Sequence, residues 1–161
     1  MSKLHRSRVT KSDNWITPVW VWEVIRPFIP PETTLWEGFP SPCLTSVRAL
    51  QKIGEVVVTK GDFFDVSTST MCVTNPPFSI KFKALERLLQ TGNDFALLIP
   101  SWCMACATVR KLVHKYSFEP HFIMLPKRVH FLDPDSLQPV GKAGWDSVFI
   151  TKGLLTTKQL T

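Results

Sequence analysis

The chain has 161 residues, of which 44% are hydrophobic and 11% aromatic, and 19 Lys and Arg against 13 Asp and Glu give a net charge of +6. This composition is typical of a packed globular protein and excludes an intrinsically disordered one. The longest apolar stretch, residues 95–109, is interrupted by Pro100 and Ser101 and is shorter than the about 20 residues that span a membrane. We therefore expect a cytoplasmic protein without a membrane partner, and the positive charge favours nucleic acid as its partner.

Two further features of the composition limit the possible architectures. Four cysteines are too few for a disulfide scaffold in a chain of this length. Cys103 and Cys106 have the spacing of a metal-binding pair, but a structural zinc site needs four ligands, and the sequence has no second such pair. We expect these two cysteines to be small apolar residues on a helix, and we expect no metal site.

The first half of the chain alternates helical and extended patterns. Residues 1–13 are polar and basic, which predicts a flexible arm in front of one domain over 14–161. Apolar residues at helical spacing, breakers and β-branched runs then predict the following elements in order: a helix over 19–28, a strand over 34–36, an irregular loop over 37–43, a helix over 44–53 that ends at Gly54, and a strand over 55–59.

The second half continues this alternation. It predicts a strand over 71–74, a helix over 79–90 closed by Gly92, a strand over 95–99, a helix to about Lys115, and two last strands over 121–124 and 147–151. Strands that alternate with helices indicate an α/β fold with a doubly wound, mostly parallel sheet. The last two strands are linked without a crossover helix, so we expect an antiparallel pair at the edge of the sheet.

The most informative motif is Asn75-Pro76-Pro77-Phe78, which follows the predicted strand over 71–74. In a doubly wound sheet, ligands bind beyond the carboxyl ends of the strands. The two prolines remove backbone donors, so the turn presents oxygens, and those of Asn75 and Pro76 can accept both hydrogens of an aromatic amine. This frees the nitrogen lone pair to attack a methyl sulfonium. Phe78 can stack on the base, a contact worth about 1–3 kcal/mol.

With this motif the sequence resembles the amino-methyltransferases, whose hallmark is (D/N/S)PP(Y/F/W). It is most similar to the adenine-specific DNA methyltransferases of bacteria and their viruses. The similar segments occur in the family's order between residues 14 and 151, at 15–18, 35–37, 61–65, 75–78, 95–100 and 128–131. The resemblance implies a Rossmann-like class I methyltransferase fold, S-adenosyl-L-methionine as cofactor, and adenine in nucleic acid as acceptor, with DNA favoured over RNA.

The resemblance also assigns roles to individual residues. The expected catalytic residues are Asn75, Pro76, Pro77 and Phe78. The expected cofactor-binding residues are Trp15, Thr17, Pro18, Glu37, Phe39, Asp62, Phe63 and Asn75. The expected substrate-binding residues are Phe78, Ser79, Lys127, Arg128, His130 and Phe131.

Other roles remain open for several of these residues. Glu37 can hold backbone amides of its loop, and Asp62 can cap a turn. One of Phe63 and Phe64 is expected in the core. Lys127, Arg128 and His130 can form a solvated edge.

The sequence departs from the family pattern at two places. The first loop of the family reads E-P-F-x-G-x-G, whereas here Ser41 and Cys43 stand at the glycine positions. The second strand lacks a final carboxylate for the ribose, since it ends in Val58-Thr59-Lys60. Each departure weakens cofactor affinity by about tenfold or more, about 1.4 kcal/mol per tenfold.

These departures leave alternatives open. One is a catalytically inactive methyltransferase fold that binds nucleic acid or supports a partner subunit; a homodimer is a further possibility. Another keeps the chemistry and changes the acceptor to RNA adenine or to a protein glutamine. The enzymatic prediction requires a pocket beside Asn75 that is large enough for a nucleoside sulfonium. A corner filled with side chains, or a pocket that is too small, would remove this prediction and leave only a basic α/β fold.

Overall fold

The structure, a computed structural model, describes residues 15–140 and 145–154; the predicted arm over 1–13 lies outside these ranges. The described residues form one six-stranded sheet in the order β2-β1-β3-β4-β6-β5. Its strands are β1 (Leu35–Glu37), β2 (Val56–Val58), β3 (Met71–Thr74), β4 (Phe95–Pro100), β5 (His121–Met124) and β6 (Ser147–Lys152).

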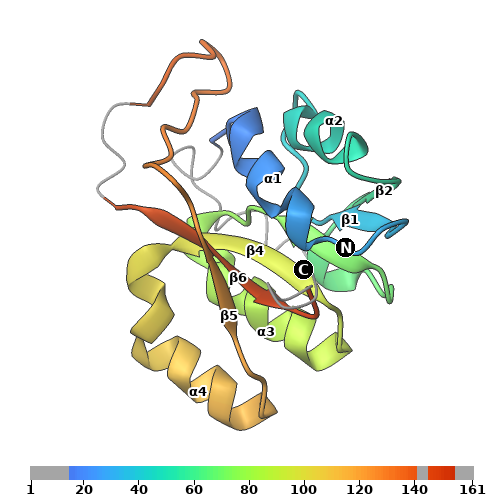
Figure 1. The fold of residues 1–161 in the computed structure, drawn as a ribbon, viewed down its shortest axis with the longest axis vertical. Helices are drawn as coiled ribbons and strands as arrows, with labels where there is room; N and C mark the ends of the chain where they lie inside the picture. Colours follow the sequence, from blue (N-terminus) through green and yellow to red (C-terminus); the bar gives the residue numbers. More distant parts are fainter. Residues whose placement is uncertain (1–14, 141–144, 155–161) are drawn as a thin grey trace.

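Strand directions agree with the sequence-based expectation. Strands β1 to β4 pair in parallel, while β6 pairs antiparallel with both β4 and β5. The reversed strand β6 is therefore second from the edge, and the edge strand β5 runs in the same direction as β1 to β4 (Figure 1). This arrangement confirms the expected mostly parallel, Rossmann-like α/β fold.

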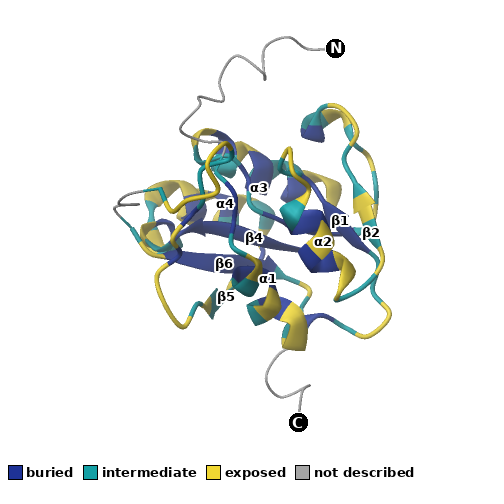
Figure 2. Cartoon of the chain, turned by 90° about the horizontal axis from the view of Figure 1, so that it is seen from above, coloured by how far each residue is buried: buried dark blue, intermediate teal, exposed yellow. Residues whose placement is uncertain are grey.

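Helices cover both faces of the sheet. Helices α1 (Val19–Ile25) and α2 (Thr45–Gln51) lie on one face, and α3 (Lys81–Thr91) and α4 (Ala107–Tyr116) lie on the other (Figure 1). Phe95, Leu97 and Ile99 of β4 pack with α3 and α4, whereas the intervening residues pack with α1. Both faces of β4 are thus buried, which explains its continuous apolar sequence (Figure 2).

Several predicted helices begin or end in 3₁₀ turns. The predicted helix over 19–28 ends as α-helix at Ile25 and continues as a 3₁₀ turn over Arg26–Phe28, because Pro27 has no N–H to donate. The predicted helix over 79–90 begins with the 3₁₀ turn Phe78–Ile80 before α3. Gly92, with φ of +75°, caps α3 as predicted.

The expectation for the cysteine pair was partly wrong. Cys103 lies buried in the 3₁₀ turn Ser101–Ala105, and Cys106 precedes α4, so the two do not share a helix. Burial is the main cause that raises the pKa of Cys103 to about 11, which makes its thiol unreactive near neutral pH. Within the described ranges no cluster of three or more His, Cys, Asp or Glu could hold a metal ion.

No helix in the described ranges is long and apolar enough to cross a membrane.

Candidate active site

The candidate site lies at the edge of the sheet where the parallel strands end. Strand β1 ends at Glu37, and Asn75 follows β3. The pairing of Pro100 with Ser147 brings the end of β4 next to the start of β6. The topology therefore gathers four segments that are far apart in the sequence, at the edge where doubly wound folds bind ligands.

The side chain of Asn75 is held in one orientation. Its Nδ2 donates a hydrogen bond of 2.8 Å to Oγ1 of Thr17, a residue that is only 5% exposed. Its Oδ1 is buried and has no hydrogen-bond partner among the described residues. A buried unpaired acceptor costs about 1–3 kcal/mol, and at a functional site the missing partner is commonly a donor of a ligand. Asn75 thus presents one fixed, unused acceptor, and Thr17 positions it.

Four aromatic side chains pack together at the end of the Asn75–Phe78 turn, and we call Trp15, Phe78, Phe131 and Trp145 the aromatic box. The ring of Phe78 meets the other three nearly at right angles, with centroid distances of 6.3 Å to Trp15, 5.7 Å to Phe131 and 5.4 Å to Trp145. Two backbone hydrogen bonds of 2.8 and 2.9 Å between Ile16 and Leu132 hold the segments of Trp15 and Phe131 side by side. Sequence analysis had placed Trp15, Phe78 and Phe131 in the site but had not included Trp145.

Asn75 is half-buried as a residue, but the oxygen that the enzymatic prediction needs is not open to solvent. Oδ1 of Asn75 is buried, and the rings of the aromatic box pack on one another. Such packing is favourable because it removes apolar surface from water, at about 25 cal/mol per Å². A nucleobase can therefore reach Oδ1 of Asn75 only when the groups that cover this atom move aside.

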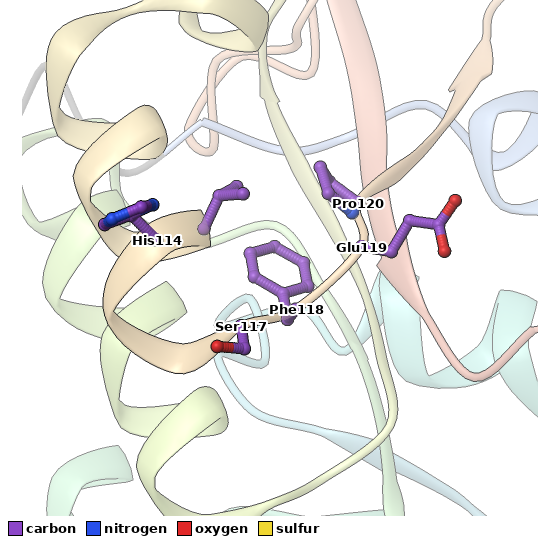
Figure 3. A pocket seen from close by; sticks show the side chains of 6 residues that line it. His114, Ser117, Phe118, Glu119 and Pro120 are labelled. Atoms are coloured by element: carbon purple, nitrogen blue, oxygen red, sulfur yellow. The ribbon is translucent and has the colours of Figure 1, made fainter.

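An open depression of about 490 Å³ lies elsewhere, at the turn between α4 and β5. It is lined by residues that include His114, Phe118 and Glu119 (Figure 3). The depression lies before the first residue of β5, whereas Asn75 follows the last residue of β3. Because β5 and β3 run in the same direction, the depression and Asn75 lie at opposite ends of the strands. It does not belong to the candidate site.

Glu37 acts as an anchor for the loop that follows β1. It is completely buried, and its Oε1 accepts hydrogen bonds from the backbone N–H of Phe39, at 3.0 Å, and from the hydroxyl of Thr74. Burial raises the pKa of Glu37, while Thr74, Ser46 and the Phe39 N–H oppose this rise. Of the two roles open for Glu37, the structure shows the backbone anchor.

The rings of Trp36, Phe39 and Phe63, which we call the aromatic stack, lie beside this loop. Phe63 stacks with Trp36 at 5.0 Å and with Phe39 at 4.4 Å, and it is only 3% exposed. It is therefore the core residue of the Phe63–Phe64 pair. A Cβ atom at Gly38 would come within 2.8 Å of the Phe63 ring, so glycine at this position permits the stack. The indole of Trp36 donates to Oγ1 of Thr59 at 2.7 Å, just beyond β2.

Asp62 caps the 3₁₀ turn Phe63–Asp65. Its Oδ1 accepts a hydrogen bond of 2.9 Å from the backbone N–H of Phe64. This is the capping role that the sequence left open. The second carboxylate oxygen takes no part in the cap, so Asp62 keeps one acceptor for another group.

The segment that was expected to bind substrate alternates between the core and the surface. Val129 and Phe131 are 1% exposed, whereas Lys127, Arg128 and His130 are exposed. Nε of Arg128 lies 3.2 Å from Oδ1 of Asp146, and Nζ of Lys127 lies 4.9 Å from the ring of Trp20. The structure thus places these cationic side chains on a solvated surface. The same segment carries Phe131, which belongs to the aromatic box.

Two other expected residues flank the Asn75 turn. Pro18 precedes α1 as its N-cap, which continues the segment that carries Thr17. Ser79 is exposed and follows Phe78 in the short 3₁₀ turn. A residue that sequence analysis missed, Lys81, donates a hydrogen bond of 2.9 Å to the carbonyl of Phe78 and fixes the end of the turn. Its position three residues after Phe78, at the start of a helix, was the available sequence clue.

The residues present suit the two ends of S-adenosyl-L-methionine to different degrees. The unpaired Oδ1 of Asn75 and the hydroxyl of Thr17 provide polar groups where the reacting end would lie, and Asp62 has a free acceptor for the nucleobase. At the nucleoside end, Phe39 lies on the ring of Phe63, so a base can stack on Phe63 only after Phe39 leaves it. In this structure the residues thus fit the reacting end of the group but not its nucleobase.

Comparison with known proteins finds similarity in structure but not in sequence. No family model matches the chain, and no curated protein matches it by sequence. Among solved structures, wild-type Trm5b from Pyrococcus abyssi is similar with a TM-score of 0.48 and 13% sequence identity, over 89% of this chain and 51% of that chain. The present chain thus spans about half the length of Trm5b, and the similarity concerns the fold alone.

Proposed function

We propose that this protein methylates the exocyclic amino group of adenine in nucleic acid, with S-adenosyl-L-methionine as donor. The observation that carries the proposal is the buried, unpaired Oδ1 of Asn75, which Thr17 holds in a fixed orientation at the carboxyl edge of the sheet. An amine N–H is the kind of group that this oxygen lacks. The sequence resemblance favours DNA over RNA, and the net charge of +6 favours a polyanion.

In this proposal the protein accelerates methyl transfer mainly by positioning the substrate amine. Oδ1 of Asn75 accepts one amine hydrogen and the carbonyl of Pro76 accepts the other, so that the nitrogen lone pair points away from both. When bound, S-adenosyl-L-methionine supplies the electrophilic methyl group. Holding the nitrogen in line at near-attack distance accounts for most of the rate increase, and the methylated nitrogen then releases its proton to water. The aromatic box excludes water and offers Phe78 as a stacking surface.

The proposal is tested with pooled DNA and RNA and labelled S-adenosyl-L-methionine. After incubation the nucleic acid is digested to nucleosides and separated. We expect the label in N6-methyladenine, and in DNA more than in RNA. Label in another nucleoside, or none in either pool, would contradict the proposal.

A second candidate is a methyltransferase fold that binds nucleic acid without turnover. It is favoured by the closed aromatic stack and by the hydroxyl of Thr59, bonded to Trp36, just beyond β2 where the family has a ribose carboxylate. Isothermal titration separates the two candidates. Binding of S-adenosyl-L-methionine, alone or with an oligonucleotide, is required by the first, whereas oligonucleotide binding without any cofactor binding identifies the second.

The state of the aromatic stack leads to a prediction on cofactor affinity. Phe39→Ala is expected to bind S-adenosyl-L-methionine two- to tenfold more tightly, because a stacking contact of roughly 0.5–1.5 kcal/mol no longer has to be broken. Isothermal titration of the variant and the wild type measures the difference. Phe64→Leu is the control, since Phe64 meets Phe63 edge-on at 5.2 Å and does not lie on its face. Weaker binding by Phe39→Ala would mean that this ring is itself a cofactor contact.

A further inference from the structure

Trp145 has a polar atom that the fold does not use. Its Nε1 is buried and has no hydrogen-bond partner in the described part of the chain. A tryptophan N–H normally finds a partner when it is buried, and leaving it unpaired costs about as much as a lost hydrogen bond. Trp145 lies just before β6, and its ring meets that of Phe78 at 5.4 Å and 78°. The unused donor therefore lies in the aromatic box.

The same box is adjacent to an unused atom of the opposite kind. Asn75 begins the turn that ends at Phe78, and its Oδ1 is a buried acceptor without a partner. Thr17, which holds Asn75, is two residues from Trp15, another member of the box. One unpaired donor thus belongs to a ring that contacts Phe78, and one unpaired acceptor lies three residues before Phe78 in the same turn. A flat ligand with a donor and an acceptor side by side on one edge would satisfy both.

We propose that Trp145 is a specificity-determining residue that donates its indole N–H to the ring nitrogen beside the reacting amine, while Asn75 accepts from that amine. This inference rests on the proposed function and names the edge by which the base is recognised. Adenine presents its amino group next to the acceptor N1, and cytosine has an equivalent edge. Guanine, thymine and hypoxanthine present a carbonyl beside a ring N–H, so their edge would oppose both protein atoms. A site that leaves buried polar groups unpaired by the wrong ligand discriminates strongly.

The arrangement requires that the base be unpaired. N1 and the amino group of adenine are both engaged in a Watson–Crick pair, so the base must be flipped out or single-stranded to reach Trp145 and Asn75. Both protein atoms are covered in the structure, so the rings of the box separate when the base enters.

The test combines Trp145→Phe, which keeps an aromatic ring and removes the N–H, with an oligonucleotide in which 1-deazaadenine replaces the single adenine. Fluorescence anisotropy gives the Kd without cofactor, and methyl transfer gives kcat and KM. We expect the wild type to lose about tenfold in affinity for the 1-deaza oligonucleotide, and Trp145→Phe to lose about tenfold for the normal one. Trp145→Phe should lose nothing more on the 1-deaza oligonucleotide, since the same hydrogen bond is already absent.

Two controls accompany this test, one a protein variant and the other a modified oligonucleotide. Trp22→Phe removes another buried, unpaired indole N–H, but Trp22 packs against Phe149 in the layer of α1, so this variant should discriminate against 1-deazaadenine like the wild type. An oligonucleotide with 7-deazaadenine alters the other edge of the base and should bind the wild type unchanged.

The inference is overturned if the wild type binds the adenine and 1-deazaadenine oligonucleotides equally, or if neither binds. It is also overturned if the loss of affinity from Trp145→Phe and the loss from 1-deazaadenine multiply when the two changes are combined. The comparison on the wild type remains decisive even if Trp145→Phe does not fold. Methyl transfer that is indifferent to 1-deazaadenine would refute the role of Trp145 and leave the proposed function standing. Weaker binding of the 1-deazaadenine oligonucleotide without any methyl transfer would support the role of Trp145 in binding and refute the proposed function.

Discussion

Asn75→Ala is expected to lower the kcat of methyl transfer by about 10²–10³-fold, the size found when one preorganised polar group of an active site is removed. The variant loses the oxygen that would accept a hydrogen from the substrate amine. The fold should tolerate the change, because Oδ1 has no hydrogen bond among the described residues and only the bond from Nδ2 to Thr17 is lost. That bond is worth about 1 kcal/mol.

Steady-state kinetics on a single-stranded oligonucleotide and a thermal melt of each variant provide the measurement. Thr17→Val is the matched comparison: it keeps Asn75 but removes the hydroxyl that orients it, so kcat should fall by about tenfold, and Thr17→Ser should restore it. Oligonucleotide binding by Asn75→Ala should change far less than kcat. An Asn75→Ala protein that melts normally and methylates within a few-fold of the wild type would refute the role of Asn75.

Local patterns in the sequence were sufficient for much of the fold. The run Phe95–Pro100 is apolar throughout because both faces of β4 are covered, and this continuous apolar run predicted a strand over 95–99. Gly92 caps α3 because glycine adopts the left-handed conformation at little cost. Asn75 was identified because a strand followed by two prolines fixes where its side chain lies. Each of these inferences depends on residues that are close in the sequence.

The state of the site could not be predicted in this way, because it depends on contacts between distant segments. Trp145 is 67 positions from Phe78 (145 − 78), and the two meet only because β6 is inserted beside β4. The contact of Phe39 with Phe63 requires the loop after β1 to fold over the turn after β2. Apolar periodicity does not encode such pairings, so the sequence predicted neither the contact of Trp145 with Phe78 nor that of Phe39 with Phe63.

Glu37→Ala is expected to lower the free energy of unfolding by about 3 kcal/mol. The substitution leaves the N–H of Phe39 and the hydroxyl of Thr74 without their shared acceptor, and each unpaired buried donor costs about 1–3 kcal/mol. For a protein of this size the loss corresponds to a melting temperature lower by roughly 6–12 °C. Glu37→Gln is the control, because its amide oxygen keeps an acceptor in a side chain of the same shape.

The pH dependence of stability tests the charge state of Glu37. Burial raises its pKa above the ordinary value of 4.5, so the folded protein binds this proton more tightly than the unfolded chain does. Its contribution to stability is therefore fully present below pH 4.5 and is lost as the pH rises through the raised pKa. Relative to Glu37→Gln, the wild type should gain stability as the pH is lowered from 7 towards 4.5.

Denaturant unfolding of both proteins across this range measures the difference. Other carboxyl groups titrate there as well: hydrogen bonds from the backbone N–H groups of Ser136 and Asp135 lower the pKa of Asp133, and Lys115 lowers that of Glu86. Both groups are present in the two proteins, so their effects cancel in the difference. A wild type that instead loses stability relative to Glu37→Gln on acidification would show that the buried group is held as a carboxylate. In that case Glu37 would bring a negative charge to the end of β1, where a sulfonium is proposed to bind, and its role would extend beyond anchoring the loop.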